Sequence, residues 1–222
     1  MITPKALDFL FENRLKDSKQ WFEAHKGQYR ELVVEPLIEL SRKLSDTMLE
    51  IDTRIIVEPK KTISRIYRDI RFSRDKTLYR DVMWLVFMRD KKLYNGLPGY
   101  FFEFSPRGFR YGCGYYQASN ESLNQIRSLI LSGDKSFKKA LKTYESQDVF
   151  SLEGDKYKRS RYPEAPENVK DWLERKNFCF IHNSKDFELL FSKDLADTLK
   201  KDFLLIEPIY EFLSKAQGKT GE

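Results

Sequence analysis

Hydrophobic residues recur every three or four positions through the first fifty residues, and this spacing predicts amphipathic helices. Thr3, which is followed by a proline, is a typical helix start. Asp17 or Ser18 begins a second helix that ends near Gly27. A longer third helix follows, and Pro36 kinks it or divides it in two because proline cannot continue the backbone hydrogen bonds. We therefore expect the N-terminal region to be helical.

The pattern changes after residue 50, where β-branched and aromatic residues favour strands. The segment 64–72 is ambiguous, because its isoleucines also lie at helical spacing, and we interpret it as a strand. Alternation then places Ile66, Ile70 and Phe72 on one face and most of the charged residues on the other. Arg68 falls on the apolar side of this strand, where it needs either a partner or a position at the edge of the sheet.

The next segments are rich in aromatic residues and separated by turn signals. They predict strands at 82–88, 99–104 and 108–116, and a late strand at 178–182. The first is apolar throughout and is expected to be buried on both faces. The next two form a hairpin, because the turn at 105–108 has proline second and glycine fourth. Gly112 and Gly114 interrupt the return strand, which indicates a bulge or the close approach of another backbone.

Helical spacing returns after the hairpin. It predicts one helix that begins at Ser119 or Asn120 and ends before Gly133, and a second helix that carries Phe137, Leu141 and Tyr144. Residues 146–167 look mostly irregular. Pro166 starts another helix, and Ser192 caps a final helix that bends near residue 208.

The order of helices, a strand meander, more helices, one late strand and a helix is typical of an α+β fold. No long linker or internal repeat is visible. We predict a single α+β domain over residues 1–216, with a central, mostly antiparallel sheet flanked by N-terminal and C-terminal helices. The late strand must return to this sheet. Residues 217–222 are expected to be a frayed tail.

Composition agrees with a folded chain of 222 residues, since 41% are hydrophobic and 14% aromatic. No apolar run is long enough to span a membrane, and the N-terminus lacks the features of a signal peptide. Only two cysteines occur, and no C-x-x-C pair is present, which suits a reducing compartment. We therefore expect a cytoplasmic protein that does not bind membranes.

The two cysteines and two histidines raise the question of a zinc site. Cys179 and His182 have C-x-x-H spacing, and Cys113 with His25 would complete four ligands. Structural zinc sites usually take their ligands from two close pairs, however, and only one close pair exists here. We expect no metal and no cofactor. Packing or capping is the favoured role of His25, and His182 fits either packing or chemistry.

Positive charge is concentrated in one stretch of the chain. Residues 58–81 contain eight basic and four acidic side chains, so this stretch carries +4 of the formal net charge of +6. A local excess indicates a patch rather than a general contribution to solubility. Later in the chain, residues 156–161 form a second, smaller concentration of basic side chains.

The same stretch carries a family resemblance. The motif RIYRDIRFSRDKTLYRD at 65–81, the hairpin and its GCGYY sequence at 112–116 resemble the bacterial conserved-hypothetical group called domain of unknown function 2461. WFEAHKGQY at 21–29, LNQIR, YKR and RKNF also match. This resemblance implies membership over nearly the whole chain but supplies no catalytic residues. Leu78 replaces a common proline of the family, and Ala165 stands where a histidine is frequent.

The basic stretch predicts an anion-binding cleft. Its expected ligand-binding residues are Arg65, Arg68, Arg71, Arg74, Lys76 and Arg80, with help from Lys158 and Arg159. The expected orienting residues are Asp69, Asp75, Glu103 and Tyr67. Tyrosines 67, 79 and 116 offer faces for stacking. Candidate partners are an anionic small molecule, such as a phosphate compound, or a nucleic acid, although no nucleic-acid-binding motif is present.

Two other hypotheses use the same residues. The arginines and acids form a purely structural ion-pair lattice in a protein-interaction domain, with Arg65–Asp69, Arg71–Asp75 or cross-strand Glu103 pairs. Alternatively, the two aspartates and Glu103 hold a divalent cation in a phosphoesterase-like site. No G-x-S-x-G, P-loop or H-E-x-x-H motif occurs, so the sequence leaves open whether the protein is an enzyme.

Overall fold

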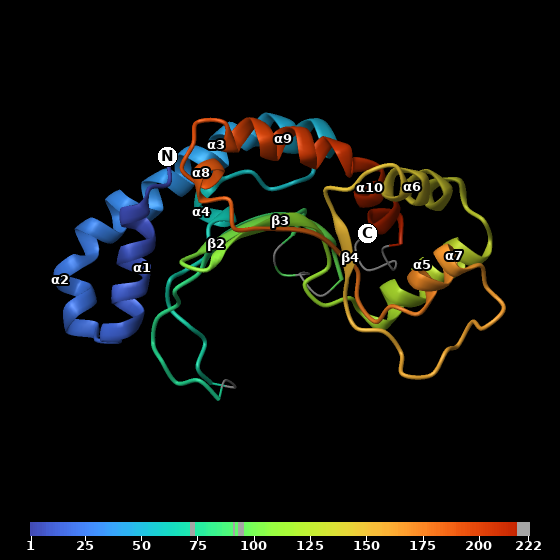
Figure 1. Cartoon of the computed structure of the whole chain (residues 1–222), viewed down its shortest axis with the longest axis horizontal. Helices are drawn as coiled ribbons and strands as arrows, with labels where there is room; N and C mark the ends of the chain where they lie inside the picture. Colours follow the sequence, from blue (N-terminus) through green and yellow to red (C-terminus); the bar gives the residue numbers. More distant parts are fainter. Residues whose placement is uncertain (72–73, 91, 93–95, 217–222) are drawn as a thin grey trace. The chain divides into compact units, whose positions relative to one another are not determined.

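A computed structural model describes residues 1–71, 74–90, 92 and 96–216. Within these residues the fold is α+β, as the sequence predicts, with an antiparallel sheet of five strands (Figure 1). The strands are β1 (Met83–Phe87), β2 (Gly99–Ser105), β3 (Gly108–Gly114), β4 (Ser151–Glu153) and β5 (Cys179–Ser184). Their order is β1-β2-β3-β5-β4, so the late strand does return to the sheet, between β3 and β4.

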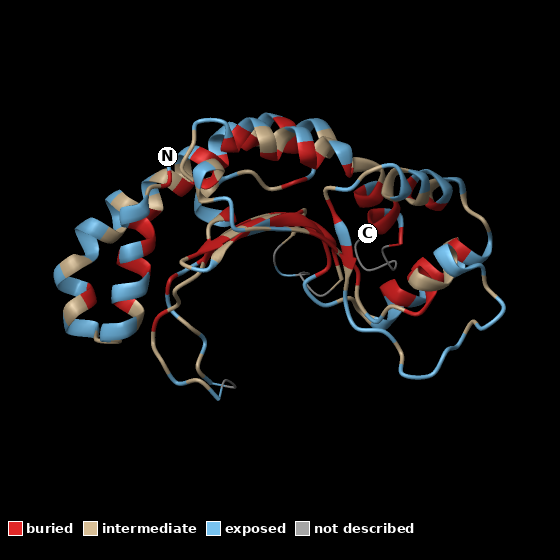
Figure 2. Ribbon diagram, in the orientation of Figure 1, coloured by how far each residue is buried: buried red, intermediate tan, exposed pale blue. Residues whose placement is uncertain are grey.

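The strands show the alternation that a half-covered sheet requires. In β2, Tyr100, Phe102 and Phe104 are fully buried, whereas Phe101 and Glu103 between them are partly exposed. Since side chains alternate across a sheet, one face of β2 lies in the core and the other does not. Figure 2 shows buried residues along the strands and on one side of the helices.

Gly112 and Gly114 of β3 lie against the backbone of β5. A Cβ atom at Gly112 would stand 1.8 Å from the Phe180 carbonyl oxygen, and one at Gly114 would stand 2.3 Å from that of Phe178. Atoms cannot approach so closely, which means that a side chain at either position would push the strands apart. The prediction of a close backbone approach is therefore confirmed.

The chain divides into two compact units. The first contains Met1–Phe87, Phe101–Tyr111 and Asn183–Lys200, and the second contains Met88–Tyr100, Gly112–His182 and Lys201–Glu222. Each unit is described by itself below. The predicted tail at 217–222 lies outside the described residues.

The first unit begins with a series of helices. These are α1 (Pro4–Lys16), α2 (Lys19–Tyr29), the π-helical turn η1 (Arg30–Val34), α3 (Glu35–Ile51) and the short α4 (Pro59–Thr62). Ser18 caps α2 by accepting a hydrogen bond from the Trp21 N–H. The π-turn precedes Pro36, whose missing N–H interrupts the α-helical hydrogen bonds, and the Glu35 N–H bonds to the Arg30 carbonyl instead. The backbone nevertheless stays helical from α2 through η1 into α3, so Pro36 is accommodated by a π-helical turn and does not divide the helix in two.

The second unit packs its helices around Trp172. They are α5 (Asn120–Leu131), α6 (Lys135–Glu145), α7 (Glu167–Leu173) and α10 (Glu207–Lys215). Trp172 is buried and contacts Phe137, Phe180 and Phe212 at ring-centroid distances of 5.5, 5.1 and 5.9 Å. Such aromatic contacts add to the area that the rings bury. Helices α6, α7 and α10 are therefore held to one another by a shared aromatic core.

The last helices differ from the prediction. The short helix α8 (Phe187–Leu190) was not anticipated, and α9 (Leu195–Leu205) is separated from α10 at Ile206 rather than bent. Pro208 explains the break, because it occupies the first turn of α10, where its missing N–H is tolerated. Within the described residues, every helix is too short or too polar to cross a membrane.

Two strand predictions were wrong in detail. The segment 64–72 is not a strand in its described part, which makes a single bridge, Tyr67 with Tyr79, while the preceding Ile63 bridges Leu85. Strand β1 is buried on alternate positions rather than on both faces. The region 146–167 is mostly irregular, as predicted, and also contains the short strand β4. Helix α2 also runs past Gly27 to Tyr29. Phe72 lies outside the described residues.

Substitution of Gly112 tests the packing of β3 on β5. We expect Gly112→Ala to destabilise the protein by at least about 2 kcal/mol, because the new methyl group overlaps the Phe180 carbonyl. Urea denaturation followed by circular dichroism measures the change.

Gly27→Ala is the matched control. No atom lies within 4 Å of its built Cβ, and Gly27 is inside helix α2. Alanine there should stabilise the protein by about 0.5–1 kcal/mol, because it limits the unfolded chain more than glycine does. Equal effects of the two substitutions would contradict the proposed packing.

Candidate functional site

The described residues of the predicted basic cluster, 65–71 and 74–80, form neither a helix nor a continuous strand before β1 and are here called the basic loop. Its two sides pair like the base of a hairpin. The Arg80 N–H donates to the Ile66 carbonyl and the Arg68 N–H to that of Leu78, both at 2.9 Å. Ile66 is buried, while Arg65 and Tyr67 beside it are exposed. The alternation expected for a strand is thus present at the base, although no continuous ladder forms.

Helix α1 and the residue after it fasten the basic loop. Arg14 donates to the Tyr79 carbonyl at 2.8 Å and to the Asp75 carboxylate at 2.5 Å. Asp17 ends α1 in the left-handed conformation, with φ of 44°, and its Oδ1 accepts the Leu78 N–H at 2.6 Å. Charge-assisted hydrogen bonds of this kind are stronger than neutral ones. Both sides of the base are therefore tied to the N-terminal helices.

An aromatic cluster supports the same base. Phe22 of α2 contacts Tyr79 and Tyr67 at centroid distances of 4.9 and 5.6 Å. Tyr79 is 1% exposed, whereas Tyr67 is 46% exposed. Burial, with a smaller effect of Tyr67, raises the pKa of Tyr79 to about 12. Of these two tyrosines, only Tyr67 therefore has an exposed surface for stacking.

Asp75 is the centre of an ion-pair group. Its Oδ2 meets Arg14 and also Arg68, the latter at 3.3 Å, while its Oδ1 accepts bonds from the N–H and hydroxyl of Thr77. The hydrogen bond from Arg14, followed by those from Thr77, holds the pKa of Asp75 well below its usual range. The expectation that Arg68 needs a partner is confirmed.

Asp69 pairs with Arg71, two residues away. Nε and Nη2 of Arg71 lie 3.0 and 2.7 Å from the two carboxylate oxygens. This bidentate pair, with the Arg71 backbone N–H, lowers the pKa of Asp69 to about 2. The suggested Arg65–Asp69 and Arg71–Asp75 pairs were wrong, because the loop is not a helix in which residues four apart meet.

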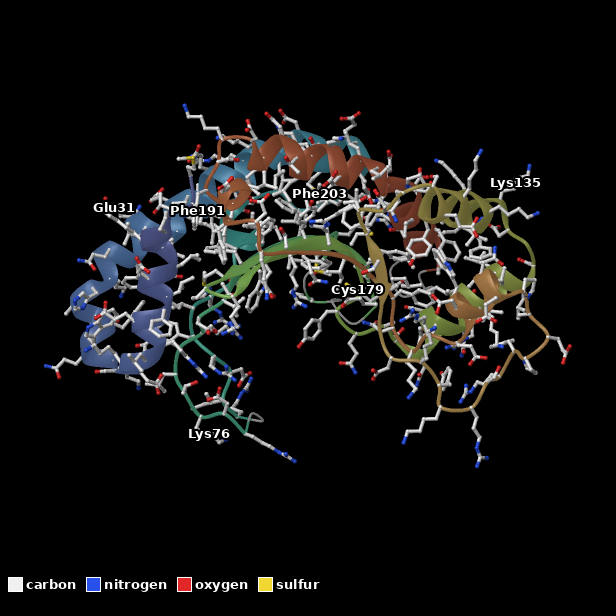
Figure 3. All side chains as sticks on the ribbon, viewed as in Figure 1. Glu31, Lys76, Lys135, Cys179, Phe191 and Phe203 are labelled. Atoms are coloured by element: carbon white, nitrogen blue, oxygen red, sulfur yellow. The ribbon has the colours of Figure 1, made fainter. Side chains whose placement is uncertain are left out.

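The cations of the basic loop thus fall into two groups. Arg68 and Arg71 meet carboxylates, and Arg80 donates to the Arg65 carbonyl and lies 4.7 Å from the centroid of the Trp84 ring. The second group consists of Arg65, Arg74 and Lys76, whose residues are exposed. Among the described residues, no carboxylate forms an ion pair with any of the three. Figure 3 labels Lys76, whose ammonium group bonds to the Ile70 carbonyl.

The other predicted residues of the cleft belong to other parts of the chain. Glu103 on β2 binds Arg110 on β3, at 2.8 and 3.2 Å, and orients that arginine rather than the basic loop. The prediction that Glu103 neutralises the loop arginines is therefore wrong, although the expectation that an arginine meets it is confirmed. Lys158 and Arg159 are exposed residues of the second unit.

The metal-binding hypothesis lacks the cluster it requires. Asp69, Asp75 and Glu103 each meet a different arginine. Across the residues that the structure describes, no group of three or more His, Cys, Asp or Glu side chains gathers as metal ligands. His25 stacks on Trp21 at 4.0 Å and contacts the Trp21 carbonyl, which agrees with the packing role. His182 contacts the Val149 carbonyl.

Sequence reasoning missed the residues that hold the loop. Arg14 and Asp17 act on partners 61 positions away, and nothing in their spacing signals this contact. It also missed the ion pair of Arg107 with Asp81 at 2.6 Å. Arg107 lines an open cavity of about 450 Å³ beside the β2–β3 turn, together with Arg110 and Lys185.

The comparison with known families decides membership. The chain belongs to the family described as conserved hypothetical protein (DUF2461). The match covers residues 5–212 of this DUF2461 protein, which includes the basic loop and the residues that fasten it. No curated protein and no solved structure matches the chain. The family description states no activity.

Asp75→Asn tests the fastening of the basic loop. Asparagine removes the charge that meets Arg14 and Arg68, so we expect a lower melting temperature at neutral pH. The folded-state pKa of Asp75 lies below the unfolded value of about 3.9. Its stabilisation is therefore fully present above that value and is lost as the pH falls through the lowered pKa. Melts by circular dichroism should show a difference from the wild type that shrinks below about pH 4.

Asp8→Asn serves as the control for this measurement. Asp8 is an exposed residue of α1, and no ion pair of Asp8 exists within the described part of the chain. Its substitution should leave the melting temperature nearly unchanged. A loss of stability for Asp75→Asn that persists undiminished at low pH would show that the charge is not responsible.

Proposed function

We propose that this DUF2461 protein binds a phosphate-containing or other anionic ligand through Arg65, Arg74 and Lys76 of the basic loop. One observation supports this proposal more than any other. The loop's own aspartates are engaged with Arg14, Arg68 and Arg71. Those acids therefore do not pair with Arg65, Arg74 or Lys76 among the described residues.

The chemistry of the three cations suits phosphate. Guanidinium groups bind phosphate oxygens through two parallel hydrogen bonds, and lysine adds a point charge. Tyr67, two residues from Arg65 in the chain and with nearly half of its surface exposed, offers a ring for a ligand that also has a planar group.

The anchors supply the preorganisation that such a site needs. Arg14 and Asp17 hold the base of the loop from α1, and Phe22 packs on its tyrosines. A ligand that meets a loop already held in place costs less ordering on binding. This explains why some cations of the cluster serve the fold while others remain for a ligand.

The ion-pair lattice accounts for only part of the cluster. It explains Arg68 and Arg71, whose partners are Asp75 and Asp69, but it assigns no role to Arg65 or Arg74. An entirely structural lattice would have matched its cations with acids, because unmatched like charges repel one another. We therefore place anion binding ahead of the purely structural role.

The double variant Arg65→Gln/Arg74→Gln tests the proposal. Titration calorimetry with inorganic pyrophosphate at constant ionic strength measures binding. We expect the variant to bind at least about tenfold more weakly, since hydrogen bonds to charged groups contribute about 1.5–3 kcal/mol each. The melting temperature should change little, because both residues are exposed.

Lys5→Gln/Arg42→Gln is the matched control. It removes the same charge from exposed residues of helices α1 and α3 in the same unit. Its affinity for pyrophosphate should stay close to that of the wild type. If both double variants weaken binding equally, the effect comes from net charge, and the basic loop is not the site.

A further inference from the structure

A second group of cations surrounds one tyrosine in the other unit. The guanidinium carbon of Arg161 lies 3.7 Å from the centroid of the Tyr157 ring. The guanidinium of Arg127 and the ammonium of Lys176 each lie 5.4 Å from the same centroid. A tyrosine face attracts cations at these distances. The ring thus brings together three positive charges from distant parts of the sequence.

The segment that carries Tyr157 is held firmly. Its N–H donates to the Glu174 carbonyl at 3.0 Å, and Lys176 N–H donates to the Asp155 carbonyl at 2.7 Å. Oε1 of the buried Glu174 side chain accepts bonds from the Ser160 hydroxyl and from the N–H groups of Arg161 and Tyr162. These bonds lower the pKa of Glu174. Arg161 is therefore positioned by a carboxylate that binds its backbone rather than its guanidinium.

Arg127 is held from the opposite direction. It is 8% exposed, and its guanidinium donates to the carbonyls of Leu173 and Arg175 and to the Tyr157 hydroxyl. These acceptors are uncharged, so its positive charge is not cancelled by them. The positive charge of a buried guanidinium whose partners are all neutral is not neutralised, so it attracts an anion.

The acids near this cluster do not balance it. Asp171 is engaged by Lys156 and Arg175. Within the described residues, no ion pair joins a carboxylate to Arg127, Arg161 or Lys176. Lys158 and Arg159, which follow Tyr157 in the chain, are exposed and form none either. Residues 155–164 contain four basic side chains against Asp155 and Glu164, and Glu174 adds one buried negative charge beside them, so positive charge remains in excess once Arg127 and Lys176 are included.

We propose that the cluster around Tyr157, consisting of Arg127, Arg161 and Lys176, binds the phosphate group of a small ligand. Arg161 and Lys176 are exposed and supply N–H donors, while buried Arg127 adds a fixed charge behind them. Because Arg161 already lies over the Tyr157 ring, that face does not accept a stacked base. Recognition is therefore of the anion itself. The residues of this proposed site belong to the second unit, whereas the basic loop belongs to the first, and the proposal does not rest on the function proposed for that loop.

The test uses the double variant Arg161→Gln/Lys176→Gln and calorimetry with inorganic pyrophosphate at constant ionic strength. We expect two binding events in the wild-type protein and loss of one in this variant, with affinity at that site reduced at least about tenfold. The control Lys138→Gln/Lys142→Gln removes the same charge from exposed residues of α6 in the same unit and should retain both events. Circular dichroism verifies folding, and Lys176→Gln alone replaces the double variant if it fails to fold.

The outcomes separate this site from the basic loop. A single binding event that is insensitive to Arg65→Gln/Arg74→Gln but lost in Arg161→Gln/Lys176→Gln supports the Tyr157 site and removes the other. The reverse result overturns the Tyr157 site. Binding of a single-stranded DNA oligonucleotide without binding of pyrophosphate also overturns it, because the proposed ligand is small.

Discussion

The pairing of Arg14 with Asp75 is the interaction on which the arrangement of the basic loop depends. One guanidinium at the end of α1 reaches a carboxylate in the loop and a backbone carbonyl at its base. This contact adds to the two backbone hydrogen bonds across the base of the loop and to the contacts of Asp17 and Phe22, which together oppose the charge repulsion within the loop. Asp75 is shared with Arg68, so one acid restrains two cations at once.

The same principle separates structural from available cations in both units. A cation that meets a carboxylate, as Arg71 and Arg110 do, is held by the fold and has lost much of its attraction for outside anions. A cation whose partners are carbonyls or aromatic rings, such as Arg127 or Arg161, keeps its charge unbalanced. Counting basic residues along a sequence does not distinguish these cases, whereas the partners do.

Local patterns predicted the fold well where a few adjacent residues determine the structure. The β2–β3 hairpin follows from its Pro-Gly turn, and the π-helical turn before α3 follows from Pro36. The segment 64–72 was misassigned because a strand needs a partner along its length, and only its base finds one. Whether such a segment forms a strand depends on contacts with distant residues, and the alternation of its side chains does not reveal those contacts.

The candidate site was predicted less completely for the same reason. The concentration of arginines at 65–80 was visible, but the role of each one depends on Arg14, which comes from 61 positions away. The sequence did not reveal the cluster around Tyr157, because Arg127 and Lys176 lie 30 and 19 positions from the tyrosine along the chain. The sequence showed the basic residues at 156–161, Arg161 among them, but only Lys158 and Arg159 were predicted to bind a ligand.

The conformation of Asp17 has a consequence for which amino acids the protein can use at that position. Its left-handed backbone suits glycine, asparagine and aspartate, while its bond to the Leu78 N–H requires an oxygen on a short side chain. Glycine satisfies the first demand and lacks the oxygen. Glutamate has the oxygen but is poorly suited to the backbone. Aspartate and asparagine meet both requirements, so in a saturation scan of position 17 only these two amino acids should preserve the stability of the protein.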